Sequence, residues 1–177
     1  MLFFRRQAGR TEKEKKNEET FTSYSAIVLS GCATIANAGQ PKSEVEQARD
    51  QWQAANISHY RFNLTLGCFC AFSQDMPLVI EVKDGQVVSM KYQSGKEIEA
   101  GNLEYFQRFA TMDKLFDEIA NGFADKGNVD TAGQKADEVK VTYDETYGFP
   151  TQISIDRIKE AIDDELGLTI SNFEKLP

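Results

Sequence analysis

The chain has 177 residues and a formal net charge of −8, with 28 acidic against 20 basic side chains. A surface of this sign repels nucleic-acid phosphates and anionic lipid headgroups, so we expect no nucleic-acid partner and no membrane attachment through basic residues. The single histidine excludes zinc sites built on two histidines, and it leaves a Ser-His-Asp triad only if His59 takes part.

Residues 29–32, with the sequence Leu-Ser-Gly-Cys, resemble a bacterial lipobox. In such signals the cysteine, here Cys32, becomes the first mature residue and carries the lipid that holds the protein at a membrane. The small and polar residues that follow Cys32 fit a tether between that anchor and a folded domain.

The residues before Cys32 fit an export signal less well. A secretory signal needs a basic start and about 7–15 apolar residues, whereas residues 24–29 form a shorter apolar stretch that includes a serine. The charged run at residues 11–19 is also foreign to such a signal. Two explanations stay open: a misassigned start or frame error upstream, or a cytosolic protein with a chance match to the lipobox.

We therefore divide the chain into a leader (residues 1–31), a tether (residues 32–42) and a single α+β domain (residues 43–177). The domain opens with a helix, because Ser43 and Glu46 have the spacing of a capping box, in which each side chain satisfies a backbone amide of the first turn. Apolar residues then recur at helical spacing: Val45, Ala48, Trp52 and Ala55.

Strands follow this helix. Residues 60–66 alternate between apolar and polar side chains, which is the pattern of a strand with one buried face. Residues 78–83 and 86–92 flank Asp84-Gly85. A two-residue Asp-Gly loop between strands predicts a β-hairpin, because both turn positions need positive φ.

A second helix is predicted by a further apolar stripe: Met112, Leu115, Phe116 and Ile119. We expect a loop at residues 124–137, and then strands at residues 139–143, around residues 153–155 and at residues 168–173. The loop before this helix carries aromatic residues that could face a partner or cover the core: Tyr105, Phe106 and Phe109.

These elements give the order α-β-β-β-α-β-β-β, with strands joined by short hairpins rather than by helical crossovers. This order predicts an α+β domain with one antiparallel β-sheet of about five to six strands and two helices packed on one face.

A series of short motifs runs through residues 52–173 in a consistent order and spacing. They are Trp52, Tyr60-Arg61-Phe62, Cys68-Phe69-Cys70, Val79-Ile80-Glu81-Val82, Asp84-Gly85, Leu115-Phe116, Tyr143-Asp144, Tyr147-Gly148-Phe149-Pro150, Ile155-Asp156 and Asp163-Asp164-Glu165. Together they resemble a bacterial family of exported lipoproteins, domain of unknown function family 6174. The resemblance implies export and fold, and it implies no activity.

Cys68 and Cys70 are the first candidate site. Residues i and i+2 of a strand have Cα atoms about 6.5–7 Å apart, at the outer limit for a disulfide, and a bulge or turn would bring them within range. If Cys32 is acylated, they remain as an even pair in an oxidising compartment. We expect a local structural disulfide. Free or differently paired thiols, and thiol–disulfide or soft-metal chemistry, are the alternatives.

An acidic set late in the chain is the second candidate: Asp144, Glu145, Asp156, Asp163, Asp164 and Glu165. Carboxylates on adjacent loops can bind calcium, which would make this a calcium-stabilised module. The spacing matches no EF-hand, however. We expect instead that Asp144 caps a turn and that residues 163–165 form a solvated connection.

The third candidate is the turn Tyr147-Gly148-Phe149-Pro150. Gly148 is expected at a φ that other residues avoid, and Pro150 fixes the entry into the next strand. Its aromatic tip is either a contact surface for a partner or a segment folded over the end of the core.

From these patterns we expect a lipid-anchored domain facing the periplasm or cell exterior, with a binding or structural role toward an envelope protein or a ligand held against the sheet. We expect no enzymatic activity and no cofactor, because the sequence has no recognisable triad, phosphate-binding loop or histidine metal site. One alternative is a thiol–disulfide or soft-metal protein that uses Cys68 and Cys70. The other is the calcium-stabilised envelope module.

Overall fold

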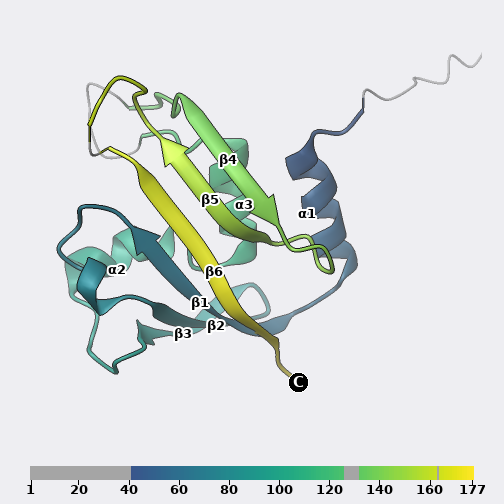
Figure 1. The fold of residues 1–177 in the computed structure, drawn as a ribbon. Helices are drawn as coiled ribbons and strands as arrows, with labels where there is room; N and C mark the ends of the chain where they lie inside the picture. Colours follow the sequence, from purple (N-terminus) through teal and green to yellow (C-terminus); the bar gives the residue numbers. More distant parts are fainter. Residues whose placement is uncertain (1–40, 126–131, 163) are drawn as a thin grey trace, which may run out of the picture. The chain divides into compact units, whose positions relative to one another are not determined.

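The structure is a computed structural model that describes residues 41–125, 132–162 and 164–177. The described residues belong to one unit of the chain, Gly39–Pro177. The predicted leader and Cys32 lie outside the described residues. The helices are α1 (Glu44–Ala54), α2 (Ala100–Gln107) and α3 (Met112–Ala120), with a short 3-10 helix at Ser73–Asp75 (Figure 1). The strands are β1 (His59–Gly67), β2 (Leu78–Lys83), β3 (Gln86–Tyr92), β4 (Glu138–Tyr143), β5 (Pro150–Asp156) and β6 (Leu166–Lys175).

All six strands form one antiparallel sheet in the order β3-β2-β1-β6-β5-β4. Strands β1 to β3 form one half and β4 to β6 the other, and the pairing of β1 with β6 joins the two halves. The predicted α+β class with an antiparallel sheet is confirmed. The helix count differs, because the described residues hold three α-helices instead of two.

Helix α2 accounts for this difference, since the sequence predicted a loop there. Its N-cap residue Glu99 makes no capping hydrogen bond through its side chain, so the usual sequence signal for a helix start is missing. Packing holds the helix instead. Phe106 is fully buried, with its ring centroid 4.8 Å from that of Phe72, and Phe109 is also fully buried. The aromatic residues around α2 therefore help to cover the core.

Helix α1 begins with the predicted capping box. The Glu46 carboxylate accepts a hydrogen bond of 2.8 Å from the backbone N–H of Ser43, and the Ser43 hydroxyl accepts one of 3.4 Å from the backbone N–H of Glu46. The buried face of the helix carries Ala48 and Trp52. Trp52 packs edge-on against Tyr60 with ring centroids 5.3 Å apart, so it anchors the helix to strand β1.

Alternation along the strands separates the two faces of the sheet. Phe62 and Leu64 of β1 are fully buried, as is Ile80 of β2, which pairs with Phe62. Each such side chain contributes about 1.5–3 kcal/mol by its burial. The β2–β3 hairpin turns at Asp84 and Gly85, whose φ values of 50° and 75° are those that the Asp-Gly motif predicts.

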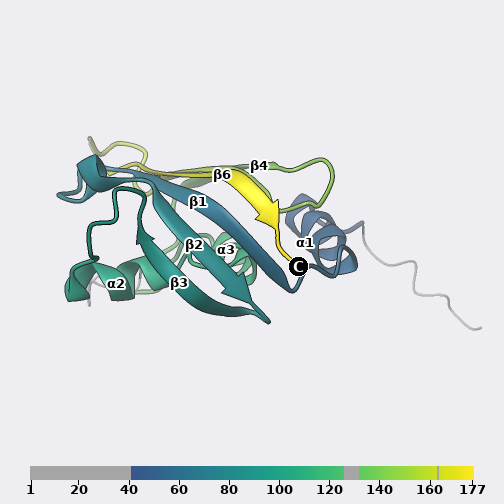
Figure 2. The ribbon, with the colours of Figure 1, turned by 90° about the horizontal axis from the view of Figure 1, so that it is seen from below.

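The three α-helices of the described residues lie on one side of the sheet, as Figures 1 and 2 show together. Within the described ranges no α-helix covers the other side, which we call the uncovered face. None of the described helices is long and apolar enough to cross a membrane.

Candidate functional site

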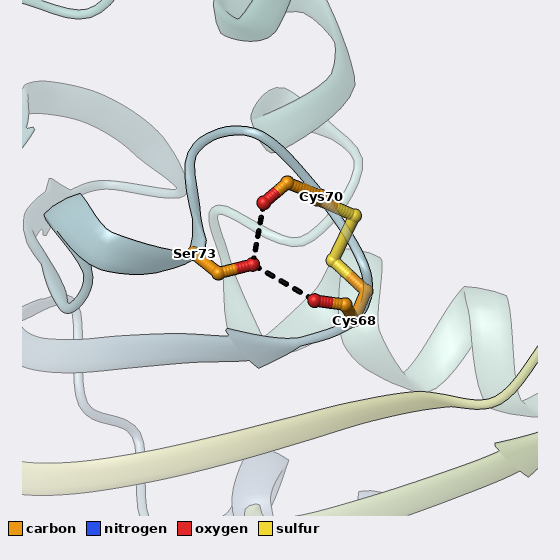
Figure 3. Close-up of a disulfide and its surroundings, with 3 residues drawn as sticks. All are labelled: Cys68, Cys70 and Ser73. Atoms are coloured by element: carbon orange, nitrogen blue, oxygen red, sulfur yellow. Dashed lines mark hydrogen bonds between the residues drawn. A yellow bond between two sulfur atoms is a disulfide. The ribbon is translucent and has the colours of Figure 1, made fainter. Parts of the chain in front are cut away.

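Cys68 and Cys70 form a disulfide directly after strand β1, as predicted. The S–S distance is 2.04 Å and the Cα–Cα distance is 5.2 Å. The chain leaves the strand at Gly67, and this turn brings the two Cα atoms closer than an extended strand would. Figure 3 shows the Ser73 hydroxyl oxygen between the two cysteine carbonyl oxygens, 2.8 Å from that of Cys68 and 2.7 Å from that of Cys70. The hydroxyl has one proton and donates it to one carbonyl at a time.

The disulfide ring presents Phe69 to solvent. Its side chain is 88% exposed, and Ile162, in the connection before β6, is 87% exposed. Gly67 pairs with Gly167 across β1 and β6, so both loops leave the sheet at the same end. This end of the domain therefore offers two large apolar side chains for contact.

The acidic candidates do not gather into one site. Asp144 lies in the β4–β5 turn, whereas Asp156 ends β5 and Asp164 and Glu165 precede β6. Asp163 lies outside the described residues. Among the residues that the structure describes, no group of three or more His, Cys, Asp or Glu side chains is arranged to hold a metal ion.

Three of these acids still influence one another. Burial raises the pKa of Asp156, and the nearby carboxylates of Asp164 and Glu165 raise it further. One oxygen of Asp164 accepts a 2.7 Å hydrogen bond from the backbone N–H of Ile158, and its other oxygen is buried without a hydrogen-bond partner. Like-charge repulsion therefore acts at this end of β5.

The turn at residues 144–150 packs against helix α1. The Asp144 carboxylate accepts hydrogen bonds from the backbone N–H groups of Thr146 (3.0 Å) and Tyr147 (2.7 Å), which is an Asx turn. Phe149 is only 4% exposed, and its ring lies 4.5 Å from that of Phe173.

The other residues of this candidate contact surface are also turned inward. Gly148 and Pro150 are buried and Tyr147 is half-buried. Gly148 has φ 79°, the conformation expected for it. Residues 147–150 thus close one end of the core, and Tyr147 is the one among these four that stays partly accessible.

The uncovered face has a hollow over strands β4, β5 and β6, which sequence reasoning did not single out. Its volume is about 340 Å³, within the range of ligand pockets. The polar side chains that line it are Lys140, Thr142, Gln152, Ser154 and Thr169. Gly167 adds no side chain, so the floor there is bare backbone. In the sequence, the one sign of this hollow was the alternation of polar residues along each strand, which indicates a solvent-facing side of the sheet.

His59, the single histidine, lies at the start of β1 and joins separate parts of the fold. Its Nε2 is 3.0 Å from a carboxylate oxygen of Glu81, and its Nδ1 is 2.7 Å from the carbonyl oxygen of Pro177. The hydrogen bond to Glu81 raises the pKa of His59, and the one to Pro177 raises it further. The protonated ring donates to both acceptors, so His59 links the start of β1 to strand β2 and to Pro177, which follows β6.

Comparison with known protein families identifies the family of this chain. A family model described as "Family of unknown function (DUF6174)" matches residues 44–175, which is most of the chain and nearly all of the described domain. No curated protein and no solved structure matches.

Proposed function

The chain belongs to the DUF6174 family of unknown function, and we propose that it is a lipid-anchored extracytoplasmic domain that binds a ligand on its uncovered sheet face without catalysing a reaction. The lipid is attached at Cys32, and the domain faces the periplasm or cell exterior.

The single observation that carries the anchoring is the disulfide between Cys68 and Cys70. The chain has three cysteines, and the one that does not take part in this bond is Cys32, within the lipobox-like residues 29–32. Structural disulfides are typical of exported proteins and rare in the cytosol. The pairing therefore supports export, and export supports the use of Cys32 as the lipid acceptor.

The length of chain before α1 supports the same arrangement. The helix begins at Glu44, and the residues between Cys32 and Glu44 can extend by roughly 35–40 Å. A domain on such a tether reaches partners near the membrane. Because the lipid would hold the domain at the membrane, the domain needs no basic surface for membrane attachment, which agrees with the net charge of −8.

The hollow on the uncovered face supports the binding role. Its lining offers hydroxyl groups from Thr142 and Ser154 and the amide of Gln152. The ammonium group of Lys140 is 2.8 Å from the carboxylate of Glu138, which balances its charge. A surface of neutral hydrogen-bonding groups fits a neutral, hydroxyl-rich ligand, so we propose a glycan as the ligand class.

An NMR titration of the ¹⁵N-labelled chain with a soluble N-acetylglucosamine oligomer tests the binding role. We expect the largest amide shifts at residues 138–142, 152–154 and 167–169, and at least a fivefold weaker affinity in Gln152→Ala. The matched control is Ser94→Ala, an exposed polar residue outside the hollow. Equal weakening in both variants, or no binding at millimolar oligomer, would contradict the glycan proposal.

Cell fractionation tests the anchoring separately. Expressed from its native upstream region, the protein should sediment with membranes, whereas Cys32→Ser should be released from them. The double variant Cys68→Ser/Cys70→Ser keeps Cys32 and should remain with the membranes. An unchanged distribution in Cys32→Ser would refute attachment at this residue.

A further inference from the structure

Strand β4 (Glu138–Tyr143) lies at one edge of the sheet and pairs only with β5 among the described strands. In an antiparallel pair, alternate residues direct their backbone N–H and C=O groups away from the partner strand. An edge strand therefore presents a row of backbone groups that an additional strand can pair with.

Helix α1 lies beside this edge (Figure 1). Side chains of the helix and of β4 line a groove between them. Glu44, Ala48 and Gln51 line the groove from the helix, and their spacing of four and three residues places them on one helix face. Val141, Thr142 and Tyr143 of β4 line it from the sheet side. The groove has a volume of about 410 Å³.

One end of the groove is closed by the turn after β4. The side-chain amide of Gln51 donates a 2.8 Å hydrogen bond to the backbone carbonyl of Glu145. Gly148 packs directly beneath this contact, against the backbone of Ala48. The helix and the strand are thus held at a set spacing at this end, so the groove is already formed without a ligand.

Three acidic residues line the groove and favour a positively charged ligand. They are Glu44, Asp144 and Glu145. None of its lining residues is Lys or Arg. Ala48 and Val141 give it a small apolar floor. A ligand that alternates basic and apolar side chains along an extended backbone would match these features.

We propose that the groove between α1 and β4 binds an extended, basic segment of a partner protein, which adds to β4 as a seventh strand. Backbone hydrogen bonds along the edge supply affinity in this mode of recognition, and the side-chain surroundings supply specificity. The acidic lining selects basic segments and accelerates their encounter. The groove shares only Thr142 with the lining of the hollow on the uncovered face, and its proposed role does not depend on the glycan proposal.

The test uses an acetylated and amidated nonapeptide of alternating Lys and Val residues, with a fluorescent label, and the full 177-residue chain. Binding is followed by anisotropy and mapped by NMR. We expect the amide shifts to fall on residues 138–145 of the edge strand and 44–51 of α1. A peptide with Glu in place of Lys, and one with N-methylated backbone amides, should each bind at least tenfold more weakly.

Two charge-reversal variants separate the groove from the overall charge. Glu44→Lys/Glu145→Lys changes two exposed groove residues. This variant should bind the Lys-Val peptide at least tenfold more weakly than the wild type. Glu97→Lys/Glu160→Lys makes the same change in net charge at exposed positions outside the groove, and its affinity should stay within twofold. Unchanged melting temperatures would show that both variants fold.

Several results would overturn the proposal. Equal weakening by both variants would indicate a general charge effect, and shifts confined to β3 or to the uncovered face would place the peptide elsewhere. Tight binding of the N-methylated peptide would rule out strand addition. A dimer in sedimentation that pairs β4 with the β4 of a second copy would assign the edge to self-association instead.

Discussion

Gly148 and Ala48 are in such close contact that a side chain at residue 148 has no room. A Cβ atom built on Gly148 would lie 2.5 Å from the carbonyl oxygen of Ala48, far inside the normal contact distance. Gly148 also has φ 79°, a region that disfavours other residues. This contact fixes the β4–β5 turn to helix α1, and it therefore sets the closed end of the groove beside β4.

Replacing Gly148 should destabilise the fold more than replacing another glycine of positive φ. Gly148→Ala combines the backbone strain, about 1–2 kcal/mol, with an overlap that adds roughly 1–3 kcal/mol. Gly85→Ala is the matched control, because Gly85 has φ 75° but no heavy atom within 4 Å of the added Cβ. Urea unfolding of both variants measures the difference. Equal losses in the free energy of unfolding would show that the turn shifts to make room for the added Cβ at no cost in stability.

His59 should make the stability depend on pH. Its pKa is raised in the folded state, so the protonated ring stabilises the fold. This contribution is complete below the unfolded-state pKa of about 6.5 and is lost as the pH rises through the folded-state pKa. Urea unfolding between pH 5 and pH 9 should show a stability difference between the wild type and His59→Gln that is largest at the acidic end. A difference that grows with pH would contradict the assigned hydrogen bonds.

Asp156 should destabilise the folded state at neutral pH, whereas protonated His59 stabilises it at acidic pH. Burial and the carboxylates of Asp164 and Glu165 raise its pKa, so the ionised form destabilises the folded state. The favourable contribution of the protonated form is present below the unfolded-state pKa, near 4, and disappears as the pH rises through the folded-state pKa. Asp156→Asn should therefore melt at a higher temperature than the wild type at pH 7.

The control for this substitution is Glu97→Gln, which removes an exposed acidic residue elsewhere. It should leave the melting temperature nearly unchanged. The same melting curves with and without millimolar calcium test the calcium-stabilised alternative. A calcium-dependent rise in the wild type that Asp156→Asn abolishes would favour that alternative over simple repulsion.

The disulfide should contribute modestly to stability. Cys68 and Cys70 are separated by two positions, and so short a loop removes little entropy from the unfolded chain, about 1–2 kcal/mol. Reductant should lower the free energy of unfolding by this amount in the wild type and have no effect on Cys68→Ser/Cys70→Ser. An insulin-reduction assay tests the thiol–disulfide alternative: catalysis by the wild type that is absent from the double variant would support it.

Local signals in the sequence predicted much of the fold. The capping box of Ser43 and Glu46, the Asp84-Gly85 hairpin and the alternation along β1 each report on residues that are close in the chain. Helix α2 was missed because Phe106 and Phe72 hold it through contacts between distant segments, while its N-cap lacks a signal.

The surfaces were harder to predict than the elements. The hollow requires β6 to pair with β5, and the groove requires α1 to lie beside β4. Residues such as Gln51 and Glu145 are 94 positions apart, so no local pattern links them. The disulfide was predicted as one of several possibilities, because its geometry depends on where the chain leaves strand β1.

The central claim is a lipid-anchored, disulfide-bearing domain, and an intact mass of the protein expressed in a bacterium from its native upstream region tests it most directly. We predict a species that begins at Cys32, is heavier by a diacylglycerol, and is two hydrogens lighter for the Cys68–Cys70 bond. An unprocessed chain with three free thiols would contradict the account and would indicate a cytosolic domain.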